Sequence, residues 1–165
     1  MKKYKVLFCD LDGTLIDTIS GETFPKGIWD MKLKFNVFDA IKKLAPEYVF
    51  IVTNQGGIKK GFVNGVTFIS KIRYVNDCIH DYCKINICDY QYCTNIGSDC
   101  FRRKPNKGML VQNLKNHHFP AAKSDMLMIG DASGLEGQFS DTDKKTAENF
   151  GIDYLDVNEF VKLYN

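Results

Sequence analysis

Long hydrophobic runs are missing from this chain of 165 residues. The apolar run near its beginning is too short for a membrane span or for the hydrophobic region of a secretory signal. We therefore expect an intracellular protein, nuclear or cytoplasmic, that has no membrane partner. A dominant charge is missing as well, because 22 basic and 20 acidic residues leave a formal net charge of only +2. The chain as a whole is therefore not a polycation, and basic surfaces have to come from local runs.

Cysteine pairs with CxxC spacing are absent, although the chain has six cysteines. Without a secretory signal, we expect these cysteines to be reduced thiols. Low-complexity linkers and internal repeats are absent too, which favours a single domain spanning residues 1–165 and a monomer. A domain of this length buries roughly 70% of the surface that its unfolded chain exposes, so it can hold a rigid site without disulfides.

Short apolar runs alternate along the chain with segments whose apolar residues lie three or four positions apart. The runs predict buried strands and the segments predict helices. This alternation favours an α/β fold with a Rossmann-like parallel sheet and helices on both faces. Residues 13–35 lack a clean period and predict a flap, with room for a small hairpin, and glycines within 56–61 predict a loop. The expected strands are 6–9, 48–52, one within 85–93, 126–129 and 152–155, and the expected helices are 38–44, 66–82, 107–116, 142–150 and 156–163.

Polar residues follow three of these strands, at the point where each strand ends. Asp10 and Asp12 follow the first strand, Thr53 and Asn54 follow the second, and Asp131 follows a later one. Open α/β sheets bind ligands outside the carboxyl ends of their strands. We therefore expect the fold to gather these distant residues into one site.

The string Asp10-Leu11-Asp12-Gly13-Thr14 points most directly to a reaction. A carboxylate such as Asp10 can attack phosphorus if a divalent metal offsets its repulsion from an anionic substrate. A second carboxylate two residues on, Asp12, can protonate the leaving oxygen and later activate water. Gly13 permits the tight turn between strand and loop. Taken alone, the string fits an ordinary turn after a strand equally well.

Four further positions favour the catalytic interpretation when they are taken together. Thr53 can donate its hydroxyl to a phosphoryl oxygen, and the backbone N–H of Asn54 can do the same. Lys104 can neutralise both a nucleophile and a transferring phosphoryl group. Asp131 is a natural ligand for a hard metal ion. In isolation each of these residues also fits a structural role, as a polar strand end, an exposed basic loop or a helix cap.

The joint pattern resembles the haloacid dehalogenase superfamily of phosphohydrolases. The resemblance implies Mg²⁺ as the cofactor, Asp10 as the nucleophile and Asp12 as the general acid/base, with Thr53 and Lys104 also catalytic. It further implies metal contacts from Asp10, from the backbone carbonyl of Asp12 and from Asp131. The matching pieces are Asp10-Leu11-Asp12-Gly13-Thr14, Thr53-Asn54, Lys104-Pro105 and Gly130-Asp131.

Longer strings resemble one branch, the 3′-phosphatase domain of polynucleotide kinase/phosphatase. Members of that family remove a 3′-phosphate from DNA ends during strand-break repair. The resemblance therefore implies that the substrate and partner is the 3′ end of a nucleic acid, with DNA expected ahead of RNA. No GxxxxGK[ST] phosphate loop occurs, so we expect a stand-alone phosphatase without the kinase half. One departure is Leu135, where the family usually has arginine. The strings are Thr23-Phe24-Pro25-Lys26-Gly27, Thr53-Asn54-Gln55-Gly56-Gly57-Ile58, Arg103-Lys104-Pro105, Gly130-Asp131-Ala132-Ser133-Gly134 and Phe139-Ser140-Asp141-Thr142-Asp143.

The site is expected to be open, because residues 13–35 leave room for a small flap and not for a large cap. An open site suits a polymer end, whereas a closing cap suits small substrates. Basic loops at the active edge are expected to contact the DNA backbone. The expected substrate-binding residues are Thr53, Asn54, Lys59, Lys60, Arg102 and Arg103.

Two other functions remain open. Sugar bisphosphate and histidinol-phosphate phosphatases share the Thr-Asn-Gln and Arg-Lys-Pro strings, so a small-molecule phosphatase is the first alternative. Many of those enzymes carry a Cys/His zinc loop, but Cys93 and Cys100 lack the further donors that four-coordinate zinc needs, and no zinc is expected. The second alternative is a catalytically silent module that binds nucleic acid ends, although each expected catalytic position holds the residue type that catalysis needs.

Overall fold

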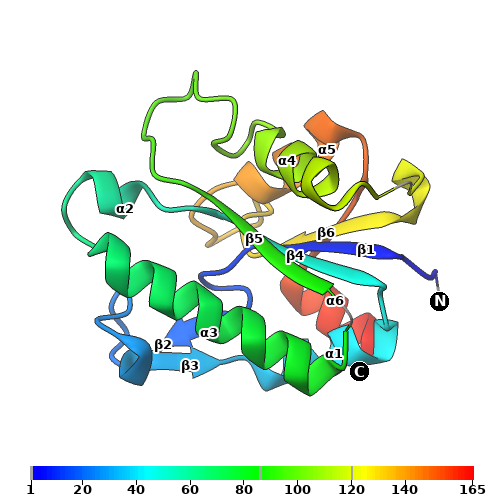
Figure 1. Ribbon diagram of the computed structural model, residues 1–165, viewed down its shortest axis with the longest axis horizontal. Helices are drawn as coiled ribbons and strands as arrows, with labels where there is room; N and C mark the ends of the chain where they lie inside the picture. The colour runs from blue at the N-terminus through cyan, green and yellow to red at the C-terminus, as the bar shows by residue number, and fades with distance from the viewer. Residues whose placement is uncertain (1, 86, 120) are drawn as a thin grey trace.

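The fold is built around a five-stranded sheet, which the computed structural model shows together with its covering helices (Figure 1). The structure describes residues 2–85, 87–119 and 121–165. Within these ranges each pairing in this sheet is parallel, and the strand order is β5-β4-β1-β6-β7. The strands are β1 (Val6–Cys9), β4 (Tyr48–Asn54), β5 (Ile87–Cys93), β6 (Met126–Gly130) and β7 (Asp153–Asp156).

Alternating side chains of the central strands supply two cores, one on each face of the sheet. In β1, Leu7 and Cys9 belong to one buried cluster, whereas Val6 and Phe8 belong to the other. Successive residues of a strand point to opposite faces, and a parallel sheet is covered on both. An uninterrupted apolar run without a polar face is therefore suited to the centre of this sheet.

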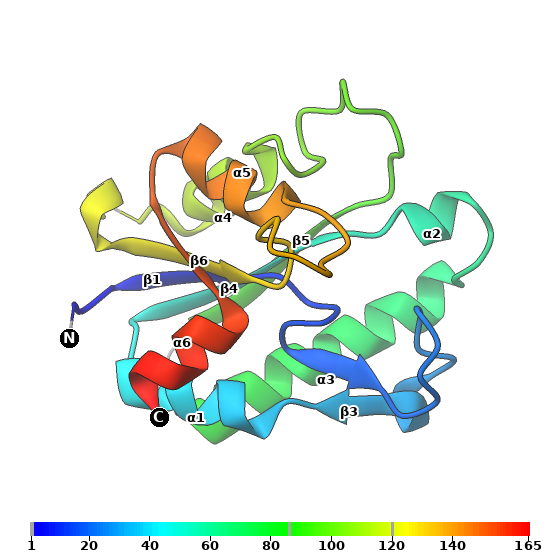
Figure 2. The same cartoon turned by 180° about the vertical axis from the view of Figure 1, so that it is seen from behind.

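Helices cover both faces of the sheet, as the two opposite views show (Figures 1 and 2). The helices α4 and α5 pack on the cluster that contains Phe8, whereas α1, α3 and α6 pack on the cluster that contains Leu7. Among the described residues, no helix combines the length and the apolar character that crossing a membrane requires. The helices are α1 (Phe35–Leu44), α3 (Gly65–Cys83), α4 (Gly108–His117), α5 (Thr142–Phe150) and α6 (Val157–Tyr164).

The segment between β1 and α1 forms a small flap. Its strands β2 (Ile16–Thr18) and β3 (Met31–Leu33) pair antiparallel, so the hairpin for which the sequence left room is present. The buried carboxylate of Asp30 accepts hydrogen bonds from the backbone N–H groups of Ser20 at 2.8 Å and Lys26 at 3.0 Å. These bonds, the one from Lys26 above all, hold the pKa of Asp30 below its usual range. The connection between β2 and β3 is thus held together by hydrogen bonds to one carboxylate.

The predicted α/β class, the parallel sheet and the helices on both faces are confirmed. One local prediction was wrong, because part of the segment predicted as a loop over 56–61 forms the short helix α2 (Gly56–Lys59). Glycine is a poor helix former, so the sequence alone favours a loop. Packing supports the helix instead, since Gly57 is buried and a side-chain carbon there would lie 3.3 Å from Phe24 and Val63.

Candidate active site

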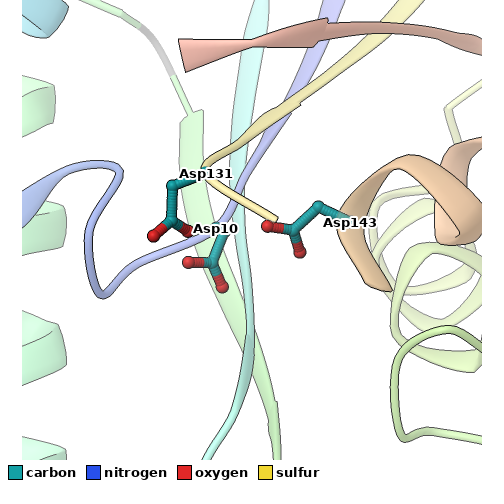
Figure 3. Close-up of side chains that lie close together, drawn as sticks. All are labelled: Asp10, Asp131 and Asp143. Atoms are coloured by element: carbon teal, nitrogen blue, oxygen red, sulfur yellow. The ribbon is translucent and has the colours of Figure 1, made fainter. Parts of the chain in front are cut away.

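Three acidic side chains from separate segments meet beyond the carboxyl ends of β1 and β6 (Figure 3). Asp10, Asp131 and Asp143 each offer a carboxylate oxygen, and these atoms all lie within 4.8 Å of one another. Asp10 is only 7% exposed and Asp143 only 1%. Carboxylates buried this closely together repel one another and need a cation to stabilise their charged forms.

Two glycines leave the space that these carboxylates occupy. Gly13 has a φ of +81°, and a side-chain carbon there would lie 2.1 Å from Oδ2 of Asp131. At Gly130 such a carbon would lie 2.2 Å from Oδ2 of Asp143. Both distances are far shorter than a van der Waals contact, so any larger residue would displace a carboxylate. Gly13 therefore serves both the turn after β1 and the site, whereas Gly130, the last residue of β6, makes room for the carboxylate of Asp143.

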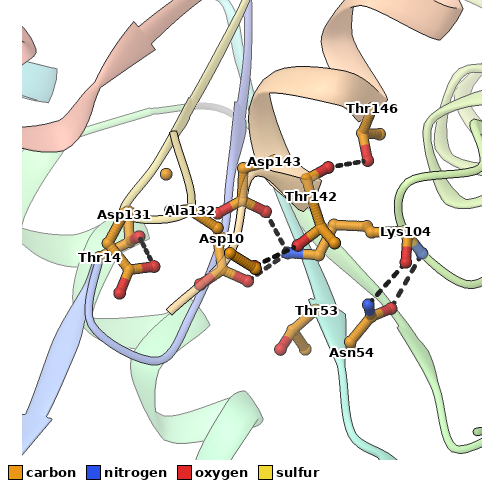
Figure 4. A network of polar contacts seen from close by, with 12 residues as sticks. Asp10, Thr14, Thr53, Asn54, Lys104, Asp131, Ala132, Thr142, Asp143 and Thr146 are labelled. Carbon is orange, nitrogen blue, oxygen red and sulfur yellow. Dashed lines mark hydrogen bonds and ion pairs between the residues drawn. The ribbon is translucent and has the colours of Figure 1, made fainter. Parts of the chain in front are cut away.

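Lys104 places a positive charge between two of the carboxylates (Figure 4). Its buried Nζ donates to Asp10, and it donates to Oδ1 of Asp143 at 2.6 Å. The side chain of Asn54, the last residue of β4, fixes the backbone of Lys104 by two hydrogen bonds of 3.0 Å. One end of the sheet thus positions a lysine that belongs to the loop before α4.

Burial and mutual repulsion dominate the electrostatics of this cluster. Burial raises the pKa of Asp10 and the charge of Asp143 adds to the effect, although Lys104 opposes it. Burial and the charge of Asp143 also raise the pKa of Asp131. For Lys104 burial acts in the opposite sense, but the neighbouring carboxylates outweigh it and raise its pKa. One ammonium group therefore faces three acidic groups, which leaves the cluster attractive to a further cation.

The donors of the cluster fit a hard divalent cation. Asp143 is already engaged, because it accepts from Lys104 and from the N–H of Ala132, at 3.1 Å from Oδ2. Asp131 receives a long contact of 3.5 Å from the hydroxyl of Thr14, and its carboxylate is half-buried. Mg²⁺ typically binds through one or two carboxylates and keeps several waters, so Asp10 and Asp131 are the residues that would hold it. The contact expected from the backbone carbonyl of Asp12 stays a prediction.

The carboxylate of Asp12 lies in a separate polar environment beside the flap. It lines a cavity of about 270 Å³ whose other walls come from Gly13 and the flap. Its Oδ2 accepts from Nε2 of Gln55 at 2.6 Å, and its Oδ1 lies 4.0 Å from Nζ of Lys71. The side chain of Asp12 is 30% exposed, so it is accessible to a molecule that enters the cavity.

The expected phosphate- and DNA-contact residues fall into two groups. Thr53 is buried close to the cluster, and its hydroxyl accepts from Nε2 of Gln55 at 2.9 Å. Lys59 and Lys60, at the end of α2, are exposed to solvent. Nζ of Lys59 donates to Oδ1 of Asn95 at 3.4 Å, in the loop between β5 and α4, and contact of either lysine with DNA stays a prediction.

The two arginines have structural contacts of their own. Arg102 donates to the carbonyl of Tyr92 at 3.0 Å, and Arg103 donates to the carbonyl of Asn95 at 2.7 Å. Both bonds brace the loop between β5 and α4, which carries Lys104. Because a guanidinium has five N–H donors, these contacts leave donors for a substrate.

The sequence prediction missed three residues that the structure adds to the site. Asp143 appeared in it only within a string shared with the family and received no role. Gln55 likewise appeared only within the shared string that begins at Thr53. Lys71 was not singled out, although it interrupts the apolar stripe of the helix predicted over 66–82. A cation within an apolar helix face is the signal that could have identified it.

Comparison with known proteins decides the classification. Residues 5–161 match the family model described as polynucleotide kinase 3 phosphatase. The chain belongs to the polynucleotide kinase 3 phosphatase family. This family member is 35% identical over 162 residues to the bifunctional polynucleotide phosphatase/kinase of Schizosaccharomyces pombe. The match covers 96% of the chain but spans only 38% of the length of the yeast protein.

A sugar bisphosphate phosphatase and a protein of histidine biosynthesis are also similar to this member of the polynucleotide kinase 3 phosphatase family. It is 27% identical over 134 residues to the D-glycero-beta-D-manno-heptose-1,7-bisphosphate 7-phosphatase of Helicobacter pylori, covering 79% of the chain and 75% of that protein. It is 31% identical over 166 residues to the histidine biosynthesis bifunctional protein HisB of Legionella pneumophila, covering 94% of the chain and 42% of that protein.

Solved structures with low sequence identity show the same fold. A HAD-like phosphatase from Mesorhizobium loti has a TM-score of 0.67 at 23% identity, over 91% of this chain and 70% of that one. The D,D-heptose 1,7-bisphosphate phosphatase of B. bronchiseptica, complexed with magnesium and phosphate, has a TM-score of 0.66 at 17% identity, over 96% of this chain and 97% of that one. The chain therefore shares its fold with these two structures, and its family is the one that its sequence matches.

Proposed function

We propose that the chain is a polynucleotide 3′-phosphatase, which removes the 3′-phosphate from DNA ends through an aspartyl-phosphate intermediate. The observation that carries the chemistry is the buried carboxylate of Asp10 held against Lys104, with Asp12 two residues away and Asp131 beside it. The match of residues 5–161 to the polynucleotide kinase 3 phosphatase family supports the choice of substrate. Repair of DNA strand breaks is the process that this activity would serve.

In the first half of the reaction, a carboxylate oxygen of Asp10 forms a bond to phosphorus. The bond between phosphorus and the 3′ oxygen of the substrate breaks, and Asp12 gives its proton to that oxygen. Lys104 and Thr53 bind the phosphoryl oxygens and offset their charge as the transfer proceeds. The product strand leaves with a free 3′ hydroxyl.

In the second half, water attacks the phosphorus of the aspartyl-phosphate. Asp12 takes a proton from that water, so it returns to the acid form with which the cycle began. Inorganic phosphate leaves and the carboxylate of Asp10 is restored. When bound, Mg²⁺ supplies positive charge that offsets the repulsion between Asp10 and the substrate.

Removal of divalent cations should abolish activity. We expect no turnover in EDTA, full recovery with Mg²⁺ and poor recovery with Ca²⁺, which takes more ligands at longer distances and disturbs the alignment of Asp10 with phosphorus. The measurement is the steady-state rate on p-nitrophenyl phosphate after chelation and readdition of each ion at matched free concentration. Full activity in Ca²⁺ alone, or activity that survives EDTA, contradicts the proposal.

The flap and the basic residues support a polymeric substrate. The flap consists of one hairpin and its connection, and a cover this small would leave room for a long ligand. Lys59, the last residue of α2, and Lys60, which follows it, are exposed, and Lys59 contacts Asn95 in the loop that carries Lys104. Each phosphate that such lysines neutralise contributes roughly −0.7 to the slope of log affinity against log salt for a single strand. Binding that weakens as the salt concentration rises would therefore indicate that these lysines contact the phosphates of the nucleic acid backbone.

A matched set of substrates tests the proposal directly. Oligonucleotides with a 3′-phosphate should be hydrolysed, whereas the same sequences with a 5′-phosphate should react much more slowly. Lys59→Ala and Lys60→Ala should raise KM on the oligonucleotide and leave p-nitrophenyl phosphate almost unaffected. Lys43→Ala is the matched control, because Lys43 is exposed near the end of α1, far from the carboxyl ends of the strands. Equal kcat/KM on 3′- and 5′-phosphates, without a salt effect, would reject a polynucleotide end as substrate.

A small-molecule phosphatase is the second candidate. The similarity to the heptose bisphosphate phosphatase of H. pylori and to HisB of L. pneumophila favours it. The thiols of Cys93 and Cys100 lie 3.5 Å apart, so they form one pair of neighbouring sulfur atoms beside the loop that carries Lys104. Hydrolysis of a sugar phosphate at a kcat/KM equal to that of the 3′-phosphate, together with one equivalent of bound zinc, would favour this candidate.

A further inference from the structure

Lys71 is a buried cation on the inner face of α3. Its side chain is only 2% exposed, and its neighbours along the helix, Phe68, Ile72 and Val75, are completely buried. Lysine is among the residues least often buried, because removing an ammonium from water costs several kcal/mol. An apolar side chain of similar length would fill this position at a lower cost, so stability of the fold does not explain the lysine.

The ammonium of Lys71 points toward the site. Its Nζ lies 4.0 Å from Oδ1 of Asp12. Within the part of the chain that the structure describes, Lys71 forms no other salt bridge. The other oxygen of the same carboxylate accepts from Gln55, which also donates to Thr53. The two oxygens of Asp12 therefore contact two different segments, the helix α3 and the residue that follows β4.

This arrangement fixes a side chain that would otherwise rotate. Asp12 lies in the turn after β1, and its carboxylate is 30% exposed on the wall of the cavity beneath the flap. Two contacts with one carboxylate restrict the χ angles of Asp12, so its side chain is already oriented before a substrate binds. A displacement of a catalytic group by about 1 Å can lower the rate by about 10²-fold, so the orientation of this carboxylate should affect kcat.

We propose that Lys71 is a positioning residue, which acts through Asp12 by holding the carboxylate where it meets the leaving oxygen and the attacking water. The proposal rests on the proposed function, because it takes Asp12 as the general acid/base. Because the side chain of Lys71 is buried, Lys71 would contact neither the phosphoryl group nor the nucleic acid strand itself.

The test compares Lys71→Met and Lys71→Gln with the wild type in Mg²⁺. On an oligonucleotide 3′-phosphate, kcat should fall about 10–100-fold, within the effect that a misplaced catalytic group has, while KM stays nearly unchanged. The loss should be smaller on p-nitrophenyl phosphate, whose leaving group needs little protonation. Lys71→Arg should recover part of the rate. Arg73→Met is the matched control, since Arg73 lies exposed on the same helix and bonds Tyr90 instead.

The double variant Asp12→Asn/Lys71→Met is the decisive comparison. If Lys71 acts through Asp12, the double variant is no slower than Asp12→Asn alone, because residues that act as a unit are not additive. Multiplied losses, or equal losses on both substrates with a lowered melting temperature, overturn the proposal in favour of a structural role. If Asp12→Asn itself loses the same factor on both substrates, the acid/base role fails and with it the mechanism of the proposed function. If Asp12→Asn shows the leaving-group dependence and neither Lys71 variant does, only the positioning role fails.

Discussion

Asp10→Asn should abolish turnover. Asp10 is the buried carboxylate at the end of β1, against Lys104 and within the acidic cluster. An amide is a far weaker nucleophile toward phosphorus and a weaker ligand for a hard cation. In a serine protease, which also forms a covalent intermediate, removing the nucleophile costs on the order of 10⁶-fold in kcat. We therefore expect no activity above background on either oligonucleotide or aryl phosphate.

The fold should survive this substitution, which makes the result interpretable. Lys104 keeps its contact of 2.6 Å with Asp143, so no buried cation is left without a partner. The control is Asp125→Asn, which removes a carboxylate just before β6, at the opposite edge of the sheet, where it pairs with Lys5 at 3.5 Å. Rates, melting temperature and circular dichroism should be compared on purified protein. Retention of more than a few per cent of kcat by Asp10→Asn, with native melting, would exclude Asp10 as the nucleophile.

The sheet and the residues at its strand ends were predictable for one physical reason. Runs such as Val6–Cys9 are apolar on both faces and end in acidic residues, and parallel strands bring their carboxyl ends to one edge. That rule alone places Asp10, Asn54 and Asp131 together, and the structure gathers them. The position of Lys104 does not follow from that rule, because Lys104 lies in a loop. The hydrogen bonds with Asn54 that fix its backbone depend on the three-dimensional course of that loop.

The remaining parts of the site depend on packing that sequence patterns do not encode. Asp143 lies at the start of α5, where acidic residues are common as helix-terminal groups, so its residue type gives no hint of a contact with Lys104. The helix α2 begins with two glycines, and its buried Gly57 lies close to Phe24 of the flap and to Val63. Periodicity describes one element at a time, whereas these features arise between elements.

Lys104→Met should produce the second large effect, in activity and in stability together. Lys104 is the cation that Asp10 and Asp143 share, and it is only 4% exposed. Its removal leaves three neighbouring acidic groups without that charge, and breaking a buried ion pair in this way typically destabilises a protein by about 3–5 kcal/mol. In the proposed mechanism the same removal takes away a donor to the transferring phosphoryl group, and loss of such a donor commonly costs about 10²–10³-fold in kcat.

Mg²⁺ separates the two effects of this substitution. The variant cluster carries one more net negative charge, so Mg²⁺ should bind it more tightly and raise its melting temperature by more than it raises that of the wild type. Activity should stay low even at saturating Mg²⁺, because a cation held by Asp10 and Asp131 does not replace a donor at the position of the Lys104 ammonium. Lys107→Met, three residues on and exposed, is the matched control. Full recovery of kcat at high Mg²⁺ would show that Lys104 only balances charge, and an unchanged melting temperature without Mg²⁺ would show that the buried ion pair contributes nothing to folding.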